Sequence, residues 1–313
     1  AQSVSKPHCH HMRPRCVFMG TPDIAVPALR LLAGRADVSL VVTQPDRPAG
    51  RGMEPHPSAV KTAALALGIP VWQPGSLKGC ELEPRLQGHD LFVVMAYGEL
   101  LRRPLLALPK ACINLHASLL PRWRGASPLQ AAIRAGDTQT GVCVMAMAPQ
   151  LDAGPVYLSE STPIGPHCTL PELHDRVAEI AAVALGRFLD QWPNVTAVQQ
   201  DESLATHCRK LTSDDGRLDW QSTASELDRW VRAYTPAPGC WTMAGNERLR
   251  ILGLEPLAEP IDLAPGCTRN SSGQLVVGCR NGTVAVTRLQ APGRKAMSAE
   301  DFLRGHRLPE RFG

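Results

Sequence analysis

Residues 111–121 read ACINLHASLLP, an apolar run that carries two polar side chains, Asn114 and His116, toward its end. These two residues are two positions apart, so in a strand their side chains share one face. A longer apolar run precedes them at 91–96, and a helical pattern followed by another apolar run spans 128–147. Strands separated by helices predict a parallel, doubly wound sheet, in which ligands bind at the carboxyl ends of the strands. The sequence therefore predicts that Asn114 and His116 lie at a ligand-binding edge.

The alternation of apolar runs and helical patterns extends outward from this segment. Apolar runs predict strands at 17–20, 38–42 and 70–72, and apolar residues at helical spacing predict helices at 22–32, 58–67 and 169–189. No G-x-G-x-x-G follows the first run, so a nicotinamide enzyme is disfavoured. The fold class expected here is α/β, with a Rossmann-like domain.

The pattern changes near the end of the long helix. Residues 195–211 are polar and weakly patterned, which is typical of a linker. Beyond them, short alternating runs and an Asn281-Gly282 turn predict a small, OB-like β-barrel at 212–313. Residues 1–12 contain a His/Cys cluster and read as an N-terminal extension or a tag remnant. The α/β domain is therefore expected at 13–194.

Composition excludes several classes of protein. In 313 residues, 44% are hydrophobic and 20% charged, which excludes global disorder. No apolar run approaches the ~20 residues of a membrane span. Aromatic residues make up only 4%, too few for a dense base-stacking platform. The ten cysteines form no C-x-x-C pair and several lie in apolar runs, which predicts a cytoplasmic protein without a disulfide framework or a metal site.

Three side chains are candidates for acid–base chemistry. A neutral His116 beside the amide of Asn114 suits proton transfer next to oxyanion stabilisation, although a core histidine with a turn asparagine has the same spacing. Asp152, on a Gly-containing loop, either forms a turn or orients His116, and only the second role requires the two to be close.

Cationic side chains are concentrated in three places. Arg47 and Arg51 lie in a Pro- and Gly-rich loop at 44–57. They either contact phosphates or are ordinary solvated residues. Residues 122–125, RWRG, combine two cations with an aromatic ring, and a salt-bridged loop has the same composition. Residues 269–311 contain eight Lys or Arg and only three Asp or Glu, whereas the net charge of the whole chain is only +4. This end of the chain is therefore the expected polyanion footprint, with an Arg-rich solvated face as the alternative.

These segments together resemble a known family. Residues 113–128, INLHASLLPRWRGASP, closely resemble the formyltransferase signature, specifically that of the methionyl-tRNA formyltransferases. The likeness covers nearly the whole chain, including FMGTPDIAVPAL at 18–29, TQPDRPAGRG at 43–52, LDAG at 151–154 and KAMSAEDFL at 295–303.

The resemblance implies a reaction and a set of roles. Asn114, His116 and Asp152 match the family's catalytic trio, which implies formyl transfer from 10-formyltetrahydrofolate to the α-amino group of methionyl initiator tRNA, in translation initiation and without a metal. The implied protein is a monomer, with folate and charged initiator tRNA as its partners. The implied folate-binding residues are Ala96, Tyr97, Gly98, Leu100, Ser118, Leu119, Leu120, Pro121, Leu151 and Gly154. The implied tRNA-binding residues are Arg47, Arg51, Arg288, Arg294, Lys295 and Arg304, which makes 212–313 a tRNA-binding domain.

The sequence departs from the family's usual pattern at two places. Ala117 stands where glycine is usual, and it would cost roughly 1 kcal/mol if the backbone there has a positive φ. Met53 and Glu54 replace a usual lysine pair, which removes positive charge from the presumed phosphate path. Three alternatives therefore stay open: a formyltransferase acting on an amino sugar nucleotide, a 10-formyltetrahydrofolate hydrolase, and a non-catalytic RNA-binding barrel on a degenerate α/β scaffold.

Overall fold

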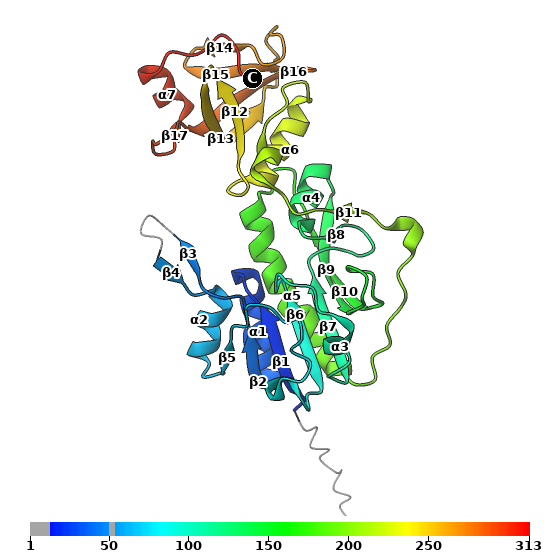
Figure 1. Ribbon diagram of the computed structural model, residues 1–313. Helices are drawn as coiled ribbons and strands as arrows, with labels where there is room; N and C mark the ends of the chain where they lie inside the picture. Colours follow the sequence, from blue (N-terminus) through cyan, green and yellow to red (C-terminus); the bar gives the residue numbers. More distant parts are fainter. Residues whose placement is uncertain (1–12, 50–53) are drawn as a thin grey trace, which may run out of the picture. The chain divides into compact units, whose positions relative to one another are not determined.

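The computed structural model of the chain describes residues 13–49 and 54–313 (Figure 1). The N-terminal His/Cys cluster, Arg51 and Met53 lie outside these ranges. The chain divides into two compact units. The first comprises the residues up to Leu120 together with Val142–Glu160 and Val177–Asp201, and the second comprises Pro121–Gly141, Ser161–Arg176 and Glu202–Gly313.

A seven-stranded sheet forms the centre of the first unit, and β9 and β10 extend from it into the second. Its strand order is β10-β9-β7-β6-β1-β2-β5. The strands are β1 (Arg15–Gly20), β2 (Asp37–Val42), β5 (Val71–Trp72), β6 (Leu91–Met95), β7 (Ala111–His116), β9 (Gln139–Ala146) and β10 (Val156–Pro163). The two central strands β1 and β6 are apolar and almost wholly buried, as expected of strands covered on both faces.

Helices and a hairpin complete the first unit. Figure 1 shows α1 (Val26–Arg35) and α2 (Ala59–Ala66) beside the β1–β2 side of the sheet. A short α3 (Arg103–Leu106) precedes β7, and β3 (Arg47–Ala49) pairs with β4 (Glu54–His56). The long α5 (Leu170–Gln191) contributes its residues from Val177 onward to this unit.

The expectation of a parallel sheet is correct for one part only. The pairs β1–β2, β1–β6, β2–β5 and β6–β7 are parallel, but β9 runs antiparallel to β7, with His116 opposite Cys143. The chain therefore begins β9 near the carboxyl end of β7 and runs back alongside that strand. The intervening helix, α4 (Pro128–Ala135), is equally consistent with a parallel crossover, because apolar periodicity carries no strand direction.

The second unit contains an antiparallel sheet. Its order is β12-β13-β16-β15-β14, with β17 paired to β16. The strands are β12 (Cys240–Ala244), β13 (Glu247–Pro256), β14 (Thr268–Ser271), β15 (Gln274–Cys279), β16 (Gly282–Gln290) and β17 (Met297–Ser298). The predicted hairpin turn joins β15 to β16. The unit also holds α4, α6 (Ala224–Tyr234), α7 (Ala299–Gly305) and a two-stranded pair, β8 (Arg124–Gly125) with β11 (His207–Cys208).

The predicted barrel is not closed by strand ladders. Strands β12 and β14 lie at the two edges of the sheet. Within the described ranges, the last residues form isolated bridges there, between Ala244 of β12 and Phe312 and between Cys267, just before β14, and Arg311. Apolar alternation alone does not reveal how far such a sheet closes. Of the helices in the described ranges, none has the length and apolar character needed to cross a bilayer.

Candidate functional site

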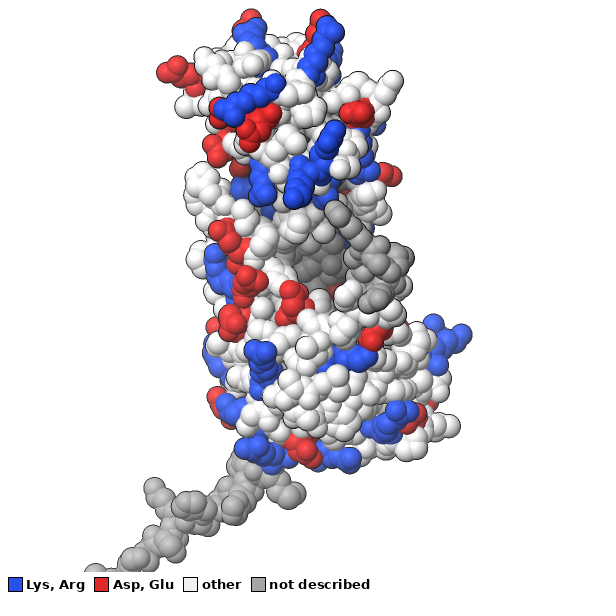
Figure 2. Space-filling model, turned by 90° about the vertical axis from the view of Figure 1, so that its left-hand side faces the viewer, with Lys and Arg blue, Asp and Glu red and all other residues white. Residues whose placement is uncertain are grey.

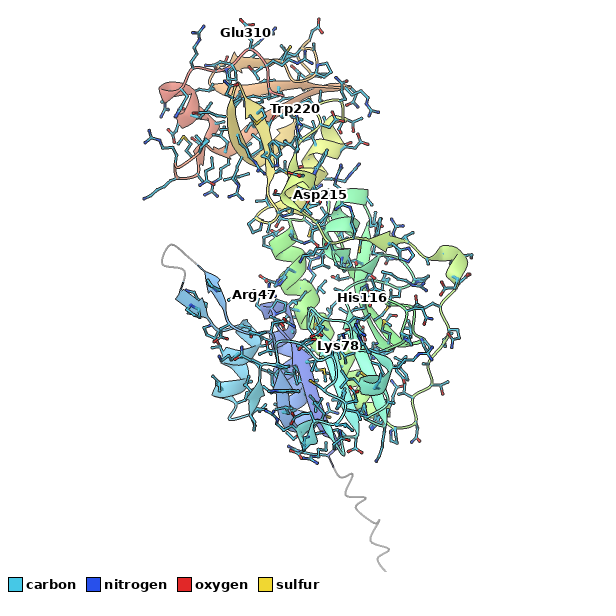
Figure 3. The ribbon with its side chains drawn as sticks, in the orientation of Figure 1. Arg47, Lys78, His116, Asp215, Trp220 and Glu310 are labelled. Carbon is cyan, nitrogen blue, oxygen red and sulfur yellow. The ribbon has the colours of Figure 1, made fainter. Side chains whose placement is uncertain are left out.

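The end of β7 carries the first two candidate residues. This strand lies between β6 and β9, with Asn114 opposite Val94 on one side and Met145 on the other. His116 is 6% exposed and Asn114 is partly buried. The strand alternation places both side chains on one face of the sheet, as the spacing predicts. Figure 3 labels His116 where β7 ends.

The structure brings His116 and Asp152 together, although 35 residues separate them in the sequence. The distance from His116 Nδ1 to Asp152 Oδ2 is 3.6 Å, and the two side chains are only 7% and 12% exposed. Asp152 has a φ of +49°, a left-handed conformation that aspartate adopts more readily than most residues. A carboxylate at this position restricts the orientation of the imidazole.

The loop that carries Asp152 is held on two sides. An added Cβ at Gly154 would lie 1.8 Å from the carbonyl oxygen of Ala146, so no larger residue fits there. On the other side, Gln200 Nε2 donates to the carbonyl oxygens of Asp152 (2.8 Å) and Gly154 (2.7 Å). Sequence reasoning missed Gln200, because a polar residue in a weakly patterned segment has no signature of such contacts.

The turn after β7 contains the predicted folate-binding residues Ser118 to Pro121. Ser118 is fully buried, and its amide donates to the carbonyl of His116 at 2.9 Å. The amide of Leu120 donates to Cys143 Sγ at 3.3 Å. Ala117 is not among the described non-glycine residues with positive φ, so it carries no left-handed strain.

The second predicted folate segment follows β6. Ala96 and Gly98 have φ angles of +49° and +96°, which turn the chain sharply beyond the sheet. Tyr97 is buried, its carbonyl accepts from Thr21 Oγ1 at 2.9 Å, and burial raises the pKa of its phenol well above the usual range. Tyr97 Oη has no hydrogen-bond partner among residues 13–49 and 54–313. Leu100 is 53% exposed.

A pocket of about 340 Å³ adjoins this segment. Its lining residues are Thr21, Pro22, Gln44, Pro45, Arg47, His56, Ser58, Ala96, Tyr97 and Gly98. Arg47, a predicted tRNA-binding residue, therefore lines the same pocket as three residues that are predicted to bind folate. Figure 3 labels Arg47, the first residue of β3.

The base of the Arg47 loop is anchored by a polar network. Lys61 Nζ lies 2.6 Å from Asp46 Oδ2, and Gln73 Nε2 donates to Asp46 Oδ1 at 2.7 Å and to the carbonyl of Gln44 at 2.9 Å. The hydrogen bonds from Lys61 and Gln73 hold the pKa of Asp46 below its usual range. The backbone next to Arg47 is thereby fixed.

The two cations of the RWRG segment are ion-paired, which favours the salt-bridged alternative. Arg122 donates to Asp137 through Nε (2.9 Å) and Nη2 (2.7 Å). Arg124 is 3% exposed and donates to Glu202 at 2.9 and 2.7 Å. Trp123 has a φ of +61°, and its Nε1 also donates to Asp137. These contacts hold a strained loop in place.

The C-terminal cations predicted for tRNA lie on exposed positions. Arg288 is on β16 opposite Ser298, and Arg294 and Lys295 lie in the following loop. Arg304, on α7, forms ion pairs with Glu300 and Asp301. On the face shown in Figure 2, basic and acidic side chains of the C-terminal sheet region are interspersed. Within the described ranges, no group of three or more His, Cys, Asp or Glu side chains could hold a metal ion.

Comparison with known proteins assigns the family. Residues 21–189 match the family model described as formyl transferase, and residues 210–307 match the formyl transferase C-terminal domain. The methionyl-tRNA formyltransferase of Methylococcus capsulatus is 46% identical over 304 residues, covering 94% of this chain and 97% of that protein.

Solved structures show the same fold at low identity. An N-formyltransferase from Helicobacter canadensis, in complex with folinic acid and dTDP-3-aminofucose, superposes with a TM-score of 0.66 at 14% identity, covering 90% of this chain and all of that one. HypX from Aquifex aeolicus, in complex with tetrahydrofolic acid, gives 0.63 at 14% identity over 93% of this chain, which spans 47% of HypX. The chain belongs to the formyl transferase family and, within it, to the methionyl-tRNA formyltransferases.

Proposed function

We propose that this protein transfers the formyl group of 10-formyltetrahydrofolate to the α-amino group of methionyl initiator tRNA. The observation that carries the proposal is the buried His116–Asp152 pair, in which His116 lies two residues after Asn114 at the end of β7. The chain is 46% identical to a methionyl-tRNA formyltransferase over almost the full length of both proteins.

The trio supplies the chemistry that formyl transfer needs. As the amine nitrogen bonds to the formyl carbon, negative charge develops on the formyl oxygen, and the Asn114 amide donates a hydrogen bond to it. His116 accepts the proton that the amine loses and returns one to the folate nitrogen as its bond to carbon breaks. Asp152 orients the imidazole and stabilises its protonated form.

We place the folate co-substrate against residues that follow β6 and β7 and residues of the Asp152 loop. Leu100 and Leu151 are 53% and 58% exposed, and apolar side chains of this size are available to pack against a pterin ring. The buried Tyr97 Oη lacks a hydrogen-bond partner in the described chain. We assign Ala96–Gly98, Ser118–Pro121 and Gly154 to the same folate site, with main-chain groups contacting the edge of the ring.

Two cationic regions are assigned to the tRNA. Arg47, which lines the pocket beside Ala96 and Gly98, and the neighbouring Arg51 are placed near the acceptor end. The exposed cations Arg288, Arg294, Lys295 and Arg304 are assigned to phosphates farther along the tRNA. Residues 212–313 are accordingly proposed as the tRNA-binding domain.

An acceptor-choice assay tests this function. The full-length protein is incubated with formyl-labelled 10-formyltetrahydrofolate and, separately, with methionyl initiator tRNA, methionyl elongator tRNA, a dTDP-linked amino sugar, or no acceptor. We expect label on the initiator tRNA, with kcat/KM at least about 10-fold above that for the other acceptors. Preferential labelling of the amino sugar, or acceptor-independent release of formate, would replace the proposal with one of the two enzymatic alternatives.

A further inference from the structure

We infer that Gln200 is a positioning residue for formyl transfer, acting through the backbone that carries Asp152. This inference rests on the proposed function. Gln200 Nε2 donates to two carbonyl oxygens of one loop, at 2.8 Å to Asp152 and 2.7 Å to Gly154. A side-chain amide has two N–H hydrogens, so one group satisfies both carbonyls at once. The opposite amide orientation would set its oxygen against two other oxygens, which fixes the assignment.

The segment that carries Gln200 is itself paired to the sheet. Two positions earlier, Val198 exchanges backbone hydrogen bonds with Val156, at the start of β10, and both bonds are 2.8 Å long. Gln200 therefore extends a short antiparallel contact and reaches the loop that immediately precedes β10. Its side chain is partly buried, so solvent competes only weakly for these bonds.

The loop needs such support because its backbone is strained and confined. Asp152 has a positive φ, a conformation that costs free energy in a non-glycine residue. On the opposite side the loop presses against Ala146, whose amide donates to the carbonyl of Pro155 at 2.8 Å. With Gln200 on one side and Ala146 on the other, the carboxylate of Asp152 is held 3.6 Å from the imidazole of His116.

Two substitutions at position 200 separate hydrogen bonding from packing. Gln200→Ala removes both bonds and the side-chain volume, whereas Gln200→Met removes the bonds and keeps a chain of similar length. The matched control is Gln199→Ala, which changes the exposed neighbouring glutamine. Single-turnover formyl transfer to methionyl initiator tRNA is measured for each full-length variant, alongside its melting temperature.

We expect Gln200→Met and Gln200→Ala to reduce the single-turnover rate about 10-fold or more, because a small displacement of a catalytic group has a large effect on rate. The KM values for folate and tRNA should stay within about 3-fold, and Gln199→Ala should match the parent. Should the alanine variant fail to fold, the methionine variant decides the matter. Parental rates in a folded Gln200→Met protein would overturn the inference.

A double-variant cycle distinguishes positioning from a general structural role. In an Asp152→Asn background, Gln200→Met should reduce the rate by less than about 2-fold, because the group it positions is already disabled. Losses that multiply would mean that Gln200 acts by another route, and the inference would fail. If Asp152→Asn alone transfers formyl at the parental rate, the catalytic assignment of Asp152 fails instead, so the two failures are distinguishable.

Discussion

At the scale of single residues, the site depends on backbone positions as much as on side-chain chemistry. Ala117, the departure from the family signature, carries no positive φ, so the substitution needs no strained backbone. Ala96, in the proposed folate site, and Asp152, in the proposed catalytic trio, do carry positive φ angles. Strain of this kind persists where surrounding contacts over-determine the conformation. Gly154 illustrates such a contact, because its α-carbon faces the Ala146 carbonyl directly.

Gly154→Ala should therefore disturb both stability and turnover. Its Cβ would lie 1.8 Å from the Ala146 oxygen, so the loop must shift and move Asp152 away from His116. We expect the free energy of unfolding to fall by about 1–3 kcal/mol, measured by urea denaturation, and formyl transfer to slow at least about 10-fold. Gly165→Ala is the control, since nothing lies within 4 Å of the added carbon. If the two variants have the same free energy of unfolding and the same rate of formyl transfer, the loop at Gly154 is not confined by the Ala146 carbonyl.

At the scale of elements, the sequence predicted the β1, β2, β6 and β7 strands closely, because continuous apolar runs mark buried strands. It did not predict β10 and β14, whose residues are largely polar or half-exposed, nor the antiparallel direction of β9. The spacing of Asn114 and His116 anticipated their common face, which is a local property. The proximity of Asp152 and the hydrogen bonds of Gln200 depend on chain crossings between distant segments, which no local pattern encodes.

The segment from Arg209 to Asp215 makes a pH-dependent contribution to the free energy of unfolding. Asp215 accepts from Arg209 and from the amide of Thr212 (2.7 Å), and these bonds, led by Arg209, lower its pKa from 3.8 to about 2. A lowered carboxyl pKa stabilises the fold above the unfolded pKa of 3.8, and this stabilisation is lost as the pH falls toward 2. Figure 3 labels Asp215 where the segment leads into α6.

Asp215→Asn should accordingly lower the free energy of unfolding at pH 7. The difference in the free energy of unfolding between variant and parent should become smaller below about pH 4 and disappear near pH 2. Urea denaturation from pH 7 to pH 2 measures this difference, with the exposed neighbour Asp214→Asn as the control. A gap that is constant across this range would show that the Arg209–Asp215 interaction does not stabilise the fold.

At the scale of the whole molecule, the charge distribution makes a prediction about tRNA binding. Combined replacement of Arg288, Arg294 and Lys295 by alanine should raise the KM for tRNA. It should also flatten the plot of log affinity against log salt by roughly one for each phosphate interaction that the substitutions remove. Arg304→Ala should have a smaller effect, because Glu300 and Asp301 already offset its charge. An unchanged salt dependence in the triple variant would make this patch an ordinary solvated face.

Asn114, His116 and Asp152 are proposed to act as one catalytic unit, and the single-turnover rate of the His116→Ala protein tests whether they do. The measurement uses saturating 10-formyltetrahydrofolate and methionyl initiator tRNA, with the melting temperature confirming that the variant is folded. We predict a rate at least ~100-fold below the parent, and a further loss on adding Asp152→Ala that is far smaller than the loss from Asp152→Ala alone. A folded His116→Ala protein that transfers formyl at a near-parental rate would contradict the account.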